Sequence, residues 1–186
     1  GGATDNGNNV INDFSSASDA AAFALSRYVC DSCYTNIATG TVSGAKVSAG
    51  WSSHVDASST DVPGALVVNA IFTDWNQLVD IQMPVPLDAS GKPIDLEHQR
   101  LTVKIMVTQG LSPRQNFPFG AALYVRTGSN EVLGASYWTT FETLGKWYTL
   151  SMATDDYETW WASHPSSDPT SPHFLGIKFG TGYADE

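Results

Sequence analysis

Apolar and polar residues alternate along several short segments of this chain, and this period of two constrains the fold more than any other feature. In the segment AALYVRTG, Leu123 and Val125 are apolar, whereas Tyr124 and Arg126 stand at the alternate positions. Successive side chains of a β-strand point to opposite faces of a sheet. The segment therefore predicts a strand that buries one row of side chains and presents an aromatic ring and a guanidinium group on the other.

The same alternation recurs along the chain. Strands are expected in VINDF, GAKVSAGW, GALVVNAIFTDW, LVDIQMPVP, RLTVKIMVTQG, AALYVRTG, SYWTTF, KWYTLSM and HFLGIKFG. The rows expected to face a core are Leu66, Val68, Ala70 and Phe72; Val79, Ile81 and Met83; Tyr148, Leu150 and Met152; and Leu175, Ile177 and Phe179. One short helix is expected in SASDAAAFALSRY, capped by Ser16 or Ser18. About nine strands separated by turn residues predict an all-β fold, a two-layer antiparallel β-sandwich.

Length and charge limit the possible partners. The 186 residues, 42% of them hydrophobic, predict one domain over residues 10–186, and the aperiodic GGATDNGNN at residues 1–9 reads as a linker or a mature N-terminus. Nine basic against 19 acidic residues give a formal charge of −10, which repels nucleic acid and anionic membranes, so neither is expected as a partner. The low charged fraction of 15%, with abundant Ser, Thr, Gly and Asn, is common in exported β-proteins, so we expect a secreted or cell-surface location.

Sequence motifs for catalysis are missing from the chain. It has no G-x-S-x-G, no H-E-x-x-H, no P-loop and no G-x-G-x-x-G after a strand. Carboxylate pairs for glycoside hydrolysis could be assembled from several acidic residues, but the spacing selects none of them. The acidic, aromatic segment TDDYETWW is expected to be a solvated loop.

The segment CDSC contains the only two cysteines, Cys30 and Cys33. A redox role would require a βαβ unit, and a zinc site would require a second pair of ligands, neither of which the sequence predicts. A small-loop disulfide is expected if the protein is exported, and two free thiols if it is not. Either state has a local structural role.

The order of six segments resembles that of the jelly-roll carbohydrate-binding modules attached to bacterial mannanases and β-glucanases. These segments are VINDFSSASDAAAF, GALVVNAIFTDWNQLVDIQMPVPLD, LTVKIMV, AALYVRTGS, LGKWYTLSM and FLGIKFGTG. The resemblance spans about residues 10 to 180 and rests on strand signatures. It implies a monomeric jelly roll that binds β-linked plant cell-wall polysaccharide, β-mannan or β-glucan, without catalysis and holds an attached or neighbouring glycoside hydrolase close to its substrate.

The resemblance also implies a binding face on one concave sheet. The residues expected there are Asp80, Gln82, Tyr124, Arg126, Trp138 and Lys178, with Trp75 and Trp51 in loops at the rim. Sugar rings would stack on the aromatic side chains, and their hydroxyl groups would bond to the polar ones. A structural cation–π contact or ion pair is the alternative role for Tyr124 and Arg126.

Many such modules hold a structural calcium ion, for which Asp13 matches the first position and Asp185, in the terminal GYADE, is the candidate for the last. The alternative function is an enzyme on the same sandwich, a polysaccharide lyase or glycoside hydrolase that uses Tyr124, Arg126, Lys178 and an acidic residue. A third reading is an adhesion or structural domain without a saccharide ligand.

Overall fold

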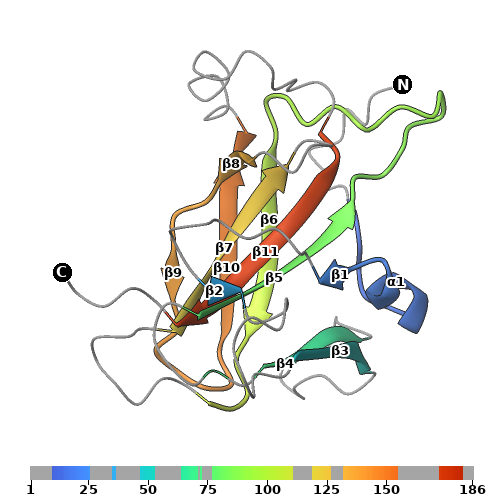
Figure 1. Ribbon diagram of the computed structural model, residues 1–186. Coiled ribbons are helices and arrows are strands. Elements are labelled where there is room, and N and C mark those ends of the chain that lie inside the picture. The colour runs from blue at the N-terminus through green and yellow to red at the C-terminus, as the bar shows by residue number, and fades with distance from the viewer. Residues whose placement is uncertain are drawn as a thin grey trace.

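The computed structural model describes residues 10–25, 35–36, 47–52, 64–70, 72, 77–110, 119–126, 132–154 and 172–181. These residues form mostly antiparallel strands and one helix of five residues, arranged as an all-β sandwich (Figure 1). The fold class expected from the alternation is confirmed, and the jelly-roll topology stays a prediction. Within the described part of the chain, no helix has the length and hydropathy to cross a membrane.

One layer of the sandwich is a seven-stranded sheet in which the main path of strands runs β1-β5-β11-β7-β8. These strands are β1 (Ala24–Leu25), β5 (Gln77–Pro84), β11 (Phe174–Thr181), β7 (Phe119–Arg126) and β8 (Val132–Ala135). Two short strands complete the sheet, β2 (Thr35–Asn36) beside β5 and β9 (Thr139–Thr140) beside β7. The long strands β5, β11 and β7 are adjacent and antiparallel, so their side chains form continuous rows across the middle of the sheet.

The opposing strands form two antiparallel pairs. They are β10 (Trp147–Ala153) with β6 (Arg100–Met106), and β3 (Val47–Ser52) with β4 (Ala65–Ala70). Leu101, Leu150 and Met152 of the first pair are buried in the same cluster as the central sheet. Leu66 and Val68 of β4 pack against that cluster from the second pair.

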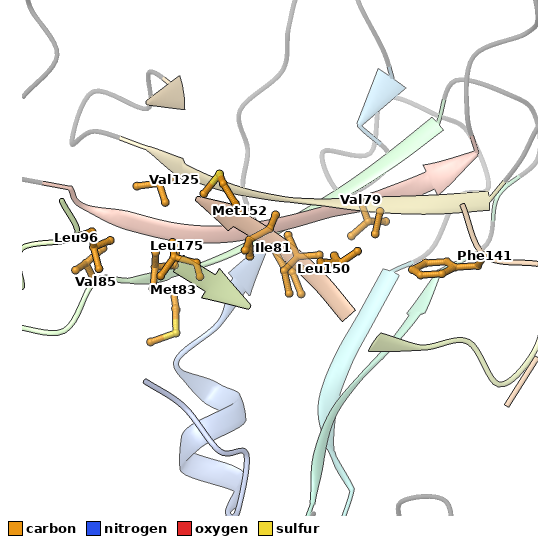
Figure 2. Packing of buried hydrophobic residues seen from close by; sticks show 14 residues of the cluster. Val79, Ile81, Met83, Val85, Leu96, Val125, Phe141, Leu150, Met152 and Leu175 are labelled. Atoms are coloured by element: carbon orange, nitrogen blue, oxygen red, sulfur yellow. The ribbon is translucent and has the colours of Figure 1, made fainter. Parts of the chain in front are cut away.

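The hydrophobic core lies between these strands, and Figure 2 shows its side chains. Every row expected to face inward belongs to it. The buried members include Val79, Ile81, Met83, Leu150, Met152, Leu175 and Ile177, and the partly buried residues packed against them include Leu66, Val68, Ala70, Phe72, Tyr148 and Phe179. The alternation therefore assigns the core-facing side of each of these strands correctly.

The prediction of a first strand at VINDF is wrong. Residues 10 to 14 form no strand, because side chains of this segment bond to the local backbone and compete with a β-ladder. Asn12 Oδ1 accepts from the Phe14 N–H at 2.9 Å, Asp13 Oδ1 accepts from the Ser15 N–H at 3.0 Å, and Phe14 has a φ of 54°. The expected helix follows as α1 (Ala17–Ala21), whose N-cap is Ser16.

Candidate functional site

The strands β5, β11 and β7 have a second face, opposite to the one that contributes to the core. Because side chains alternate, the residues of this second face are those between the core residues. They are Leu78, Asp80, Gln82 and Pro84 on β5; Phe174, Gly176, Lys178 and Gly180 on β11; and Gly120, Ala122, Tyr124 and Arg126 on β7. Five of the predicted binding residues are thus brought together: Asp80, Gln82, Tyr124, Arg126 and Lys178.

Asp80, Tyr124 and Arg126 form a closed set of hydrogen bonds, here called the buried polar network. The Tyr124 hydroxyl donates to Asp80 Oδ1, and Arg126 Nη2 donates to Asp80 Oδ2 at 2.7 Å. Arg126 Nη1 lies 3.1 Å from Tyr124 Oη and donates to it. Both carboxylate oxygens of Asp80 therefore receive a hydrogen bond, the arrangement that a buried charge requires.

Tyr124 reaches Asp80 across the intervening strand β11. Tyr124 is paired with Gly176 in the register, and Gly176 is paired in turn with Gln82 of β5. A Cβ atom at position 176 would overlap the Cζ and Oη atoms of Tyr124, so the side chain of Tyr124 lies directly over this glycine. Only glycine leaves room for the phenol to span the width of a strand.

The guanidinium of Arg126 lies over the ring of Tyr124, with its Cζ 4.2 Å from the ring centroid. It also donates through Nη1 to Gln82 Oε1 at 3.1 Å. The structural alternative for Tyr124 and Arg126, a cation–π contact and an ion pair, is therefore present. One consequence concerns Gln82, because the bond from Arg126 fixes its amide oxygen toward the network.

The buried polar network is closed to solvent, contrary to the expectation that this row is presented on the surface. The exposed fraction is 0% for Asp80 and Tyr124 and 1% for Arg126. Alternation specifies which face a side chain occupies, but it does not specify whether that face is covered. Gln82, Lys178 and Phe174, on the same face, are only half-buried.

Burial shifts the pKa of two side chains on this face, Asp80 and Lys178. It raises the pKa of Asp80 above its ordinary value, an effect opposed by the positive charge of Arg126 and by the hydrogen bond from Tyr124. Burial likewise lowers the pKa of Lys178, whereas the negative charge of Asp80 acts to raise it and Arg126 to lower it further. Lys178 lies opposite Asp80 of β5 and Ala122 of β7 in the register.

Trp138 lies at the β7 edge of the same face. A Cβ atom at Gly120, which would point to the second face, would overlap Nε1 of Trp138, so this indole covers the glycine. The preceding residue, Tyr137, is 95% exposed. Tyr137 is an exposed aromatic side chain that sequence reasoning missed, because alternation in SYWTTF gives no sign of which aromatic residue faces solvent.

The other predicted site residues do not join this group. Trp51 lies in strand β3 and not in a loop, on the two-stranded sheet opposite the central one. Asp13 is exposed, with its pKa lowered by hydrogen bonds from Ser15, and no group of three or more His, Cys, Asp or Glu residues among the described ones could hold a metal ion. The positions outside the described residues are Trp75, Asp185, Cys30 and Cys33. The calcium site and the disulfide stay predictions.

Comparisons with known protein families, with curated proteins and with solved structures found no match to this chain. The resemblance to carbohydrate-binding modules therefore stays a prediction that rests on the strand signatures.

Proposed function

We propose that this protein is a non-catalytic carbohydrate-binding module that binds β-linked plant cell-wall polysaccharide, β-mannan or β-glucan, on the second face of its central sheet. The observation that carries the proposal is the gathering of Asp80, Gln82, Tyr124, Arg126 and Lys178 on one face of three adjacent strands. The module would be secreted or at the cell surface and would hold a glycoside hydrolase close to its substrate. A calcium ion at Asp13 belongs to the same proposal.

The exposed fractions of these side chains indicate which of them can contact a polysaccharide. Asp80, Tyr124 and Arg126 are buried, so they position other groups and do not touch the polysaccharide. The half-buried Gln82 and Lys178 would contact the polysaccharide, together with the exposed ring of Tyr137, which precedes Trp138 in the segment between β8 and β9. The Arg126 bond to Gln82 Oε1 leaves the amide N–H groups of Gln82 to donate to a sugar hydroxyl. The ring of Tyr137 offers a surface on which a sugar can stack.

The second candidate is a polysaccharide lyase, and one observation favours it. Tyr124, Asp80, Arg126 and Lys178, which could transfer a proton and neutralise charge, lie next to one another. A general acid or base must come within hydrogen-bond distance of its substrate, however, and the hydroxyl of Tyr124 is buried and engaged with Asp80. The geometry therefore supports binding better than catalysis.

The proposal is tested by affinity electrophoresis in gels containing β-mannan, mixed-linkage β-glucan or xyloglucan. The wild-type protein should be retarded by at least one polymer, and titration calorimetry should then compare Tyr137→Ala and Gln82→Ala with it. Each variant should lose about 1 kcal/mol of binding free energy, roughly fivefold in Kd, because a stacking surface or a hydrogen-bond donor is removed.

The matched control is Leu144→Ala, which truncates another exposed side chain, before β10. It should bind as the wild type does. Absence of binding to every polymer would contradict the proposal, as would unchanged affinity in both site variants. Release of unsaturated products that absorb in the ultraviolet would replace it with the lyase.

A further inference from the structure

The charged groups of the second face are not balanced. The carboxylate of Asp80 is paired with the guanidinium of Arg126 at 2.7 Å, and its other oxygen is occupied by Tyr124. No described residue forms a hydrogen bond or an ion pair with Lys178. Asp80 is the only carboxylate among the described residues of this face, so its single negative charge is shared by two positive charges, those of Arg126 and Lys178.

The positive charge of Lys178 lies in a protein whose net charge is negative. The chain carries a formal charge of −10, so its overall field repels anions. Lys178 is half-buried, where a charge is screened less by solvent and salt than on an open surface. A complementary anion next to Lys178 would thus gain a local attraction that the rest of the molecule does not provide.

We propose that Lys178 binds a carboxylate group of the glycan, so that the preferred ligand is a β-linked polysaccharide that carries uronic acid residues. The inference rests on the proposed carbohydrate-binding function and adds a substrate class to it. The ammonium group of Lys178 has three donors for carboxylate oxygens. Gln82 stands on the same strand two residues from Asp80, the register partner of Lys178, and its amide N–H groups can bond to the same sugar residue.

A pair of matched ligands tests this inference. Short glucuronic-acid-bearing xylan oligosaccharides are compared by titration calorimetry with the same oligosaccharides after their carboxyl groups have been reduced to alcohols. The wild-type protein should bind the acidic form about tenfold more tightly, the difference expected for one charge-assisted contact, and this preference should shrink as sodium chloride is added.

Variants identify the residue responsible. Lys178→Met should abolish the preference, because it weakens binding of the acidic form much more than binding of the reduced form, and Lys178→Arg should retain most of the preference. Lys104→Met is the matched control, because Lys104 is an exposed lysine on β6, outside the central sheet, and it should keep the full preference. The ligand and salt comparison on the wild type needs no variant to fold.

The outcomes separate this inference from the proposed function. Equal affinity for the two forms, or a preference that survives in Lys178→Met, overturns the carboxylate site and leaves carbohydrate binding intact. Binding of β-mannan or β-glucan but not of the acidic oligosaccharides does the same. Absence of binding to every glycan overturns both.

Discussion

Replacing Arg126 with methionine tests what holds the second face together. Methionine has a similar length and fills much of the same volume, but it carries no charge and no donors. The substitution would leave the carboxylate of Asp80, 0% exposed, with the Tyr124 hydroxyl as its remaining partner in the network. The bonds from Arg126 to Asp80, Tyr124 and Gln82 would all be lost.

The expected cost follows from the burial of this ion pair. Removing one partner of a buried pair costs about 3 to 5 kcal/mol, because the remaining charge is left uncompensated away from water. Domains of this kind have total stabilities of about 5 to 15 kcal/mol, so Arg126→Met should remain folded only marginally. The loss should be smaller at pH 4 than at pH 7, because protonation of Asp80, whose pKa burial raises, removes the unpaired charge.

Urea unfolding followed by tryptophan fluorescence measures the effect. For an m-value of about 1 to 3 kcal/mol/M, the midpoint should fall by roughly 1 to 5 M. Arg100→Met is the matched control, since Arg100 is exposed and donates to Ser151 Oγ at 2.9 Å, and it should change stability by less than about 0.5 kcal/mol. The reasoning is refuted if Arg126→Met shifts the midpoint no more than Arg100→Met, or if its destabilisation is equal at both pH values.

Two further substitutions probe the same network. Gly176→Ala should cost at least about 1 to 3 kcal/mol of unfolding free energy, because its Cβ would overlap Tyr124. Gly91→Ala is the control, since the space around its Cβ is open and the only strain comes from its φ of 81°. A cost at Gly176 no larger than the cost at Gly91 would contradict the overlap. For Asp80→Asn, the stability advantage of the wild type over the variant should be largest below about pH 3.8, because a raised pKa in the folded state favours the protonated form of Asp80. This advantage should decline as the pH rises through the folded-state pKa of Asp80. Urea titrations from pH 3 to 7 measure the difference in unfolding free energy, and an increase with pH would show that the pKa is lowered instead.

The fold could be predicted from the sequence because burial of one face imposes a period of two. Val79, Ile81 and Met83 on β5 and Leu175 and Ile177 on β11 alternate without interruption, and all of them lie in the core. A one-residue shift would have placed each of them on the wrong face. The segment at residues 10 to 14 escaped this reasoning, because its short polar side chains satisfy the local backbone and no partner strand is needed.

The candidate site could be predicted only in part. Alternation gave the outward side of each strand, and the resemblance implied that these strands share one sheet. Strand pairing in the structure brings Asp80, Gln82, Tyr124, Arg126 and Lys178 to a common face. Their exposure could not be predicted, since alternation specifies the face that a side chain occupies and not whether that face is covered. The position of Tyr124 over Gly176 could not be predicted either, because a glycine in a strand does not indicate which side chain crosses it.

The buried polar network and the proposed ligand contacts are linked through Gln82. Arg126 holds the Gln82 amide oxygen at 3.1 Å, and the same guanidinium holds Asp80 in its ion pair. Any change to the network therefore alters both the stability of the sheet and the orientation of a proposed ligand contact, so a loss of affinity in Arg126 or Tyr124 variants would not by itself show contact with a ligand. Tyr137 and Lys178 form no hydrogen bond with the described part of this network, and affinity changes in their variants are the ones that report on binding.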